Sequence, residues 1–195
     1  MKYFKVILTL FTFIFLTSIS SYAQEEDNTK VGVKIGANFS TIAGDATGVK
    51  TKTGLVIGLF AQIKGTENLV IQPELVYSSE GAQFDDNSGT QVNYNYINIP
   101  VLFKLYANGQ GTGLNFNAGP QFGFLANAKI KSGNTSETIS DQISKIRFGL
   151  AFGMGVDINN IAFDLRYNLG LTNTVSKSDQ FYPSNVIQLT AGLAF

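Results

Sequence analysis

Alternation of apolar and polar residues at every second position is the feature that most constrains this chain. In residues 161–171 the odd positions, such as Phe163 and Leu165, are apolar, whereas the even positions include Asp164 and Arg166. Successive side chains of a β-strand point to opposite faces, so this pattern predicts a long strand with one apolar and one polar face. The same test predicts eight strands, namely Val31–Phe39, Leu55–Ile63, Leu69–Ser79, Tyr94–Tyr106, Leu114–Ala126, Ile146–Ile158, Ile161–Leu171 and Ile187–Phe195.

The lengths of the connections between these strands also alternate. The short connections are Lys64–Asn68, Ala107–Gly113 and Asn159–Asn160. The longer, polar connections are Ser40–Gly54, Glu80–Asn93, Asn127–Lys145 and Thr172–Asn185. Short turns on one rim and long loops on the other are typical of outer-membrane barrels. We therefore expect an all-β fold, an eight-stranded antiparallel up-and-down transmembrane β-barrel, whose two-residue turn at Asn159–Asn160 needs positive φ at both residues.

The distribution of charge indicates which face of the strands meets lipid. The apolar face carries no charged side chain. The polar face carries all the charged side chains of the predicted strands, namely Lys34, Glu74, Lys104, Arg147, Asp157, Asp164 and Arg166. A Lys or Arg at the middle of a bilayer costs about 2–4 kcal/mol, so we expect the uncharged face to point outward into lipid. The alternative is a soluble ligand-binding barrel, in which the apolar face points inward.

In a membrane barrel the polar residues face the narrow lumen. Buried charges are tolerated when they are paired and hydrogen-bonded. We expect a structural network of mixed sign, to which Gln62 and Gln121 also contribute. Its members in the strand halves nearer the short turns are Lys34, Glu74, Lys104, Asp164 and Arg166. Side chains can fill the interior of an eight-stranded barrel, which argues against a wide channel.

Three prolines conflict with a simple ladder of hydrogen bonds. Pro73, Pro100 and Pro120 fall inside predicted strands. Proline has no N–H to donate, so it is normally confined to strand edges and bulges. We expect bulges or kinks at these positions, although the sequence alone gives no reason why three prolines are tolerated.

The first residues have the features of a secretory signal peptide. Lys2 and Lys5 precede the apolar run Val6–Ile19, and small residues lead to a predicted cleavage between Ala23 and Gln24. The alternative is an uncleaved anchor, but the apolar run is shorter than the roughly twenty residues that a spanning helix needs. We therefore expect a signal peptide at residues 1–23, a barrel domain at residues 24–195, and export to the cell outer membrane.

The composition argues against most enzyme classes. The chain has no histidine and no cysteine, so His-dependent triads and Cys-ligated or His-ligated metal sites are excluded. Its formal net charge is zero, which gives no electrostatic basis for binding nucleic acid. We expect no catalytic residue, no cofactor and no metal site.

Several segments resemble a known family. They are Lys30–Ser40, Ile71–Ser78, Tyr96–Lys104 and Asn117–Leu125. These segments are similar to the PorT-like outer-membrane β-barrel family. Its members are described as "outer membrane protein beta-barrel domain" or "porin family" proteins of Bacteroidetes-type bacteria. The resemblance implies an OmpX/OmpA-like barrel of eight strands without one fixed activity; its founding member is linked to protein secretion. The terminal Phe195 resembles the C-terminal aromatic that the barrel-assembly machinery recognises.

The expected function is that of a structural or interaction module. We expect its four long loops to meet an unknown protein partner, with a link to secretion or envelope assembly, and its outer surface to contact outer-membrane lipid. The alternatives that the sequence leaves open are a narrow porin-like channel and the soluble ligand-binding barrel.

Overall fold

The computed structural model describes residues 29–42, 49–84, 90–109, 111–133, 135–174 and 183–195. The predicted signal peptide and its cleavage site at Ala23 and Gln24 lie outside these residues. Within the described part of the chain, no helix is both long enough and apolar enough to cross a membrane.

The described residues form β-strands joined by turns and loops. The strands are β1 (Thr29–Ile42), β2 (Val49–Lys64), β3 (Leu69–Phe84), β4 (Gln91–Tyr106), β5 (Gly113–Ser132), β6 (Thr135–Thr138), β7 (Ile146–Ile158), β8 (Ile161–Gly170) and β9 (Ser184–Ala194). All strands except β6 form the barrel wall, and β6 is a short addition to the end of β5.

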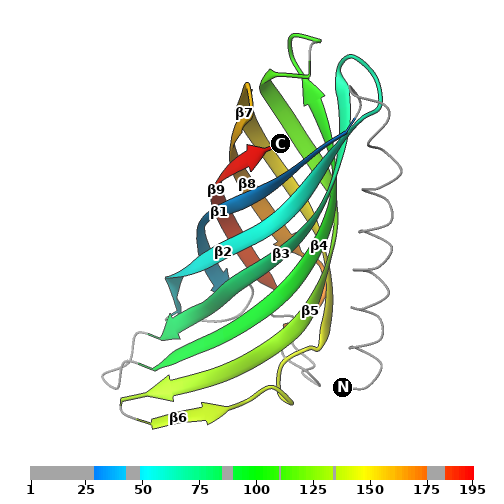
Figure 1. Ribbon diagram of the computed structural model, residues 1–195. Helices are drawn as coiled ribbons and strands as arrows, with labels where there is room; N and C mark the ends of the chain where they lie inside the picture. The colour runs from blue at the N-terminus through cyan, green and yellow to red at the C-terminus, as the bar shows by residue number, and fades with distance from the viewer. Residues whose placement is uncertain (1–28, 43–48, 85–89, 110, 134, 175–182) are drawn as a thin grey trace.

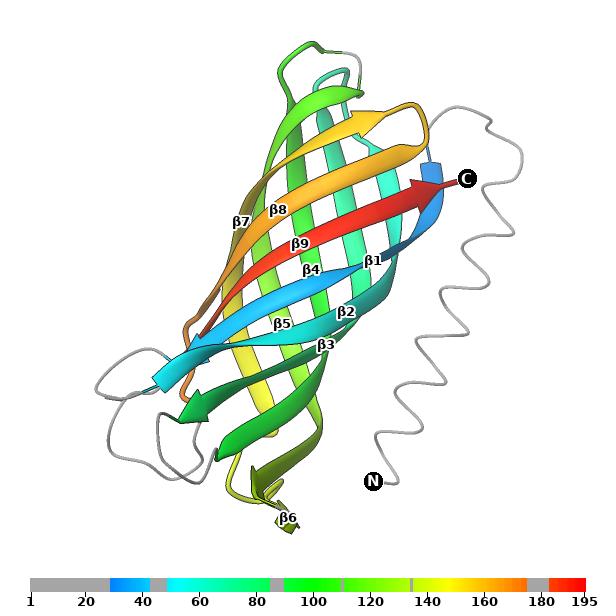
Figure 2. The same ribbon diagram turned by 90° about the vertical axis from the view of Figure 1, so that its left-hand side faces the viewer.

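Every neighbouring pair of wall strands is antiparallel, and β1 pairs with β9 to close the barrel. Figure 2 shows β1 and β9 side by side. Strand β5 continues well beyond Phe124, where its pairing with β7 begins, and β6 pairs with this extension (Figure 1). The predicted eight-stranded antiparallel barrel is therefore confirmed.

The strands reach further toward the long loops than the sequence predicted. β7 has the predicted bounds, but β3 runs to Phe84 instead of Ser79, and β5 runs to Ser132 instead of Ala126. The predicted long connections were therefore too long. The turn at Asn159–Asn160 has two residues, as expected, but only Asn159 has a positive φ, at 53°, so the expectation of positive φ at both residues was wrong.

The apolar face of the strands points outward, as predicted. On β8, Phe163 and Leu165 are 51% and 48% exposed, whereas Asp164 and Arg166 between them are 4% and 2% exposed. The same contrast holds along β4, where Phe103 is exposed and Lys104 is fully buried. A soluble barrel with this many exposed large apolar side chains would aggregate, whereas the same surface is stable in contact with membrane lipid.

The three prolines lie side by side on β3, β4 and β5, each where one ladder is interrupted. The β2–β3 pairs pass from Phe60–Glu74 to Ile63–Ile71 and skip Pro73. The β3–β4 pairs pass from Val76–Asn98 to Pro73–Val101 and skip Pro100. The β4–β5 pairs skip Pro120 in the same way. Each missing N–H thus falls where no ladder partner is required, which accounts for the tolerance.

The segment between β6 and β7 folds back onto the inward surface of β4. Ile139 and Ile143 are buried there against Tyr96 and its neighbours. The Tyr96 hydroxyl donates to the Ser144 carbonyl oxygen at 2.7 Å. Part of the predicted long connection Asn127–Lys145 is therefore packed structure that covers the inside of the barrel at this end.

Candidate functional site

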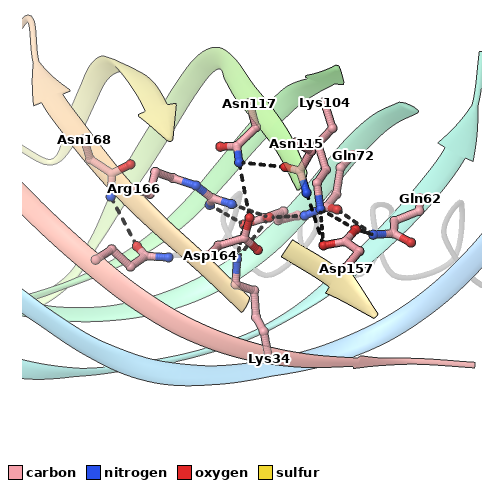
Figure 3. A network of polar contacts seen from close by, with 12 residues as sticks. Lys34, Gln62, Gln72, Lys104, Asn115, Asn117, Asp157, Asp164, Arg166 and Asn168 are labelled. Atoms are coloured by element: carbon pink, nitrogen blue, oxygen red, sulfur yellow. Dashed lines mark hydrogen bonds and ion pairs between the residues drawn. The ribbon is translucent and has the colours of Figure 1, made fainter. Parts of the chain in front are cut away.

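The lumen collects the polar side chains that the sequence placed on the inward face. The structure brings Lys34, Glu74, Lys104, Asp157, Asp164 and Arg166 together as residues at least nine-tenths buried. Arg147 is also inward, and its side chain is 12% exposed. Gln121 is buried, and Gln62 is half-buried. Figure 3 shows how residues from opposite sides of the wall meet across the lumen.

The central cluster is built around the Glu74 carboxylate. Lys34 Nζ lies 3.1 Å from both Glu74 oxygens, and the Arg166 guanidinium donates two parallel hydrogen bonds to them at 2.9 and 3.1 Å. Gln72 Nε2 donates a further bond at 2.6 Å. Asp164 lies beside this cluster, where Asn117 donates to it at 3.2 Å. One carboxylate thus pairs with two cations, and the nearby Asp164 supplies the second negative charge that balances them.

A second cluster lies nearer the short turns, around Asp157. Lys104 Nζ reaches the Asp157 oxygens at 3.1 and 2.8 Å, and the Tyr106 hydroxyl donates to Oδ2 at 2.5 Å. Gln62 donates to the same Oδ2 at 3.2 Å, and Asn115 donates to Oδ1 at 3.3 Å. Lys104 therefore pairs across the lumen with β7 and not with Glu74 on the neighbouring strand.

Amide side chains connect these two clusters. Gln62 Nε2 also lies 3.1 Å from Gln72 Oε1, and Gln72 in turn donates to Glu74. On the other side Asn117 lies 3.4 Å from Asn115 and also bonds Asp164. The result is the continuous mixed-sign network that the sequence predicted for this half of the lumen.

A third cluster lies nearer the long loops and contains a residue that the sequence reading missed. Glu80 is 1% exposed, and its carboxylate accepts bonds from Arg147 Nη1 at 2.6 Å and Nη2 at 2.5 Å. The Arg147 guanidinium also stacks 3.9 Å from the centre of the Tyr96 ring. Ser78 and Ser184 donate to the same carboxylate at 2.6 and 3.3 Å.

The Glu80 position carried a usable signal in the sequence. It was assigned to a loop, yet it continues the inward alternation of Glu74, Val76 and Ser78 on β3. The outward residues after Tyr77 are polar, so the contrast between faces disappears while the strand continues.

Among the described residues, the buried charges of the lumen balance. Its cations are Lys34, Lys104, Arg147 and Arg166, and its anions are Glu74, Glu80, Asp157 and Asp164. Since a buried charge without a partner costs several kcal/mol, this balance makes burial of the whole set possible. The arrangement fits a structural filling of the barrel.

Some described polar atoms in the lumen make no hydrogen bond to a protein partner. Among the described residues, the buried polar atoms without a hydrogen-bond partner are Asn38 Oδ1, Asn117 Oδ1, Arg166 Nε, Asn168 Oδ1 and Gln188 Nε2. A recess of about 20 Å³ lies beside Asn168 and Arg147 toward the long loops. That volume accommodates a single water molecule, which is the usual partner for such atoms.

The described residues offer no arrangement for metal binding. They contain no group of three or more His, Cys, Asp or Glu side chains placed to hold a metal ion. Phe195 is 67% exposed at the end of β9, and its N–H donates to the Val31 carbonyl oxygen at 2.7 Å. Its aromatic ring therefore stands on the outer surface at the strand junction that closes the barrel.

The sequence profile described as "Outer membrane protein beta-barrel domain" matches residues 22–176. The chain belongs to this family, and the family indicates a location in the outer membrane. No curated protein matches the chain at a significant level.

Solved structures of bacterial surface proteins are similar to this chain. Neisserial surface protein A is similar with a TM-score of 0.61 at 11% identity, over 85% of this chain and 97% of that one. Ail, the attachment invasion locus protein of Yersinia pestis, is 19% identical with a TM-score of 0.49, over 86% of this chain and 99% of that one. At these identities the likeness concerns the fold alone.

Proposed function

We propose that this protein is a closed, non-catalytic outer-membrane barrel that acts as a structural or interaction module through its long loops. The observation that carries the proposal is the lumen itself. A neutral network of ion pairs fills it, and the segment with Ile139 and Ile143 packs over its inner surface toward the loops. An interior filled in this way leaves the loops as the surface for specific contacts.

The finer parts of the proposal extend the family assignment. The protein is of the PorT-like, Bacteroidetes type, and its signal peptide is removed between Ala23 and Gln24. Phe195 presents the aromatic end to the barrel-assembly machinery, the short turns face the periplasm, and the loops contact a protein partner in secretion or envelope assembly. The support is the resemblance of the quoted segments and the exposed position of Phe195.

In-cell photo-crosslinking tests the interaction role. A photoreactive amino acid at Gln142, which is exposed near the long-loop rim, should give an adduct of one discrete mass. The same amino acid at Asn160, which is exposed in the turn at the opposite rim, is the matched control. If position 142 gave no adduct, or if positions 142 and 160 gave the same adduct, a specific partner at the loops would be contradicted.

A narrow channel is the second candidate function. The unpartnered atoms of Asn168 and Gln188 favour it, because they point to water inside the lumen. Planar bilayer recordings of the purified protein separate the two candidates. The closed module predicts no sustained current steps, whereas uniform open steps would establish the channel.

A further inference from the structure

The lipid-facing surface of β4 and β5 changes its chemistry abruptly toward the long loops. Ile97 of β4 pairs with Phe124 of β5, and both belong to the outward apolar surface. The next outward pair is Asn95 with Asn127, whose amides are hydrogen-bonded at 2.8 Å. The apolar belt therefore ends at one level on both strands.

Beyond this level, two rows of paired residues cross β4, β5 and β6. In the first row Asn93 pairs with Lys129, and Lys129 pairs with Thr138. In the second row Gln91 pairs with Lys131, and Lys131 pairs with Ser136. Directly paired residues of antiparallel strands point to the same side of the sheet. The six side chains of the donor patch, as we call it, are Gln91, Asn93, Lys129, Lys131, Ser136 and Thr138.

The donor patch is on the outside of the barrel. The residues between its members, Val92, Tyr94 and Ala128, are buried in the inward cluster. Lys129 and Lys131 are exposed, as are Ser136 and Thr138. An isolated stretch of exposed polar residues needs no ligand, but this one continues directly from the lipid-facing belt.

The donor patch is positively charged. It contains two lysines and no acidic residue, and Glu137 on β6 pairs with Ile130, which places it on the opposite face. Partial burial, followed by repulsion from the Lys131 ammonium, lowers the pKa of Lys52 at the rim of β2. Lys131 and Lys52 therefore lie close enough to repel each other, and both would attract an anion placed near them.

We propose that the donor patch binds the phosphate groups of an anionic lipid in the membrane leaflet on the long-loop side. This inference rests on the proposed membrane placement of the belt. Ammonium, amide and hydroxyl groups donate to phosphate oxygens, and the level where an apolar belt ends is where lipid headgroups lie. Lys129 and Lys131 supply the charge, and the amides of Gln91 and Asn93 supply directed hydrogen bonds.

Retention of lipid by the folded barrel tests the proposal. The purified protein in neutral detergent is titrated with bisphosphorylated lipid A, and native mass spectrometry measures the bound fraction. The variant Lys129→Gln/Lys131→Gln should bind about 30-fold more weakly at low salt, from about fivefold for each lysine near a charged surface. The control Lys30→Gln/Lys64→Gln removes two exposed lysines at the opposite rim and should bind like the wild type.

Four results would overturn the proposal. The first is that the Lys129/Lys131 variant binds lipid A as tightly as the wild type. The second is that the opposite-rim control loses as much binding as that variant, and the third is that the wild type binds a phosphate-free glycolipid as tightly as lipid A. Competition by a soluble sulfated oligosaccharide with the same lysine dependence and comparable affinity would assign the patch to a soluble glycan instead. Migration of unboiled samples on SDS gels confirms that each variant is folded. The assay requires neither a partner nor a closed lumen, so it can fail independently of the proposed function.

Discussion

Removing the Glu74 carboxylate is the sharpest perturbation of the lumen. In the variant Glu74→Leu, Lys34 and Arg166 lose their shared partner while both remain inside the barrel, at 4% and 2% exposure. Asp164, which also attracts both cations, must then serve the two of them. Breaking a buried pair by deleting one partner costs about 3–5 kcal/mol, because the remaining charge is stranded.

This cost translates into a large change in unfolding. With a urea slope of about 2 kcal/mol per M, the unfolding midpoint in detergent should fall by about 2 M. Asp141→Asn is a matched control, because it breaks the Asp141–Lys145 pair (3.4 Å), whose side chains are 96% and 75% exposed. Exposed pairs contribute little, so this midpoint should stay near the wild-type value.

A double variant separates charge stranding from lost packing. Lys34→Met/Glu74→Leu removes one cation together with the carboxylate and leaves Arg166 with Asp164. Its destabilisation should be clearly smaller than the sum of the two single changes, since residues in one network couple. If Glu74→Leu shifted the midpoint no more than Asp141→Asn, or if the single effects were additive, the lumen would be hydrated and weakly coupled, and our reasoning would be refuted.

Other changes test separate parts of the structure. Arg147→Lys keeps the charge but loses the two parallel bonds to Glu80 and the stacking on Tyr96, so the free energy of unfolding should fall by about 1–3 kcal/mol; an unchanged urea midpoint would contradict this geometry. Ile143→Asn places an amide in the buried cluster over β4 and should cost about 1–3 kcal/mol, whereas the same change at exposed Ile146 should cost little in detergent. Gly36→Ala would place a Cβ against the Leu189 carbonyl oxygen in the closing ladder, so less protein should reach the heat-modifiable folded form on gels; normal yield would show that β1 and β9 pack less closely.

The architecture was predictable because the bilayer imposes a simple rule on both faces of each strand. Phe163 and Leu165 face lipid and Asp164 and Arg166 face the lumen, so alternation and charge together gave the strand and its orientation. The predicted strand ends were wrong where the outward face of a strand stops being apolar. After Tyr77 the outward face need not be apolar, and β3 continues to Phe84 without the contrast that identified it.

The pairing inside the lumen was not predictable from alternation. Alternation places Lys104 and Asp157 on the inward face, but the stagger of strands around the barrel decides that they meet across it. Glu80 was missed for the same reason as the strand end, although it is the partner of Arg147. The prolines required the full set of ladders, because only the interrupted pairs explain where their missing N–H groups fall.

The central claim is a barrel with lipid outside and a sealed network inside, and thiol labelling tests both sides of it. The chain has no cysteine, so single cysteines can be introduced without background. Ala151 is buried in the lumen at 0% exposure, and Leu165 is 48% exposed on the outer face. In intact membranes a small charged thiol reagent should modify neither Ala151→Cys nor Leu165→Cys until the protein is unfolded. A lipid-dissolved carbene photolabel, which needs no thiolate, should label position 165 and not position 151. Rapid aqueous labelling of Ala151→Cys would reveal an open channel, and rapid aqueous labelling of Leu165→Cys would show that the apolar face does not lie in a membrane.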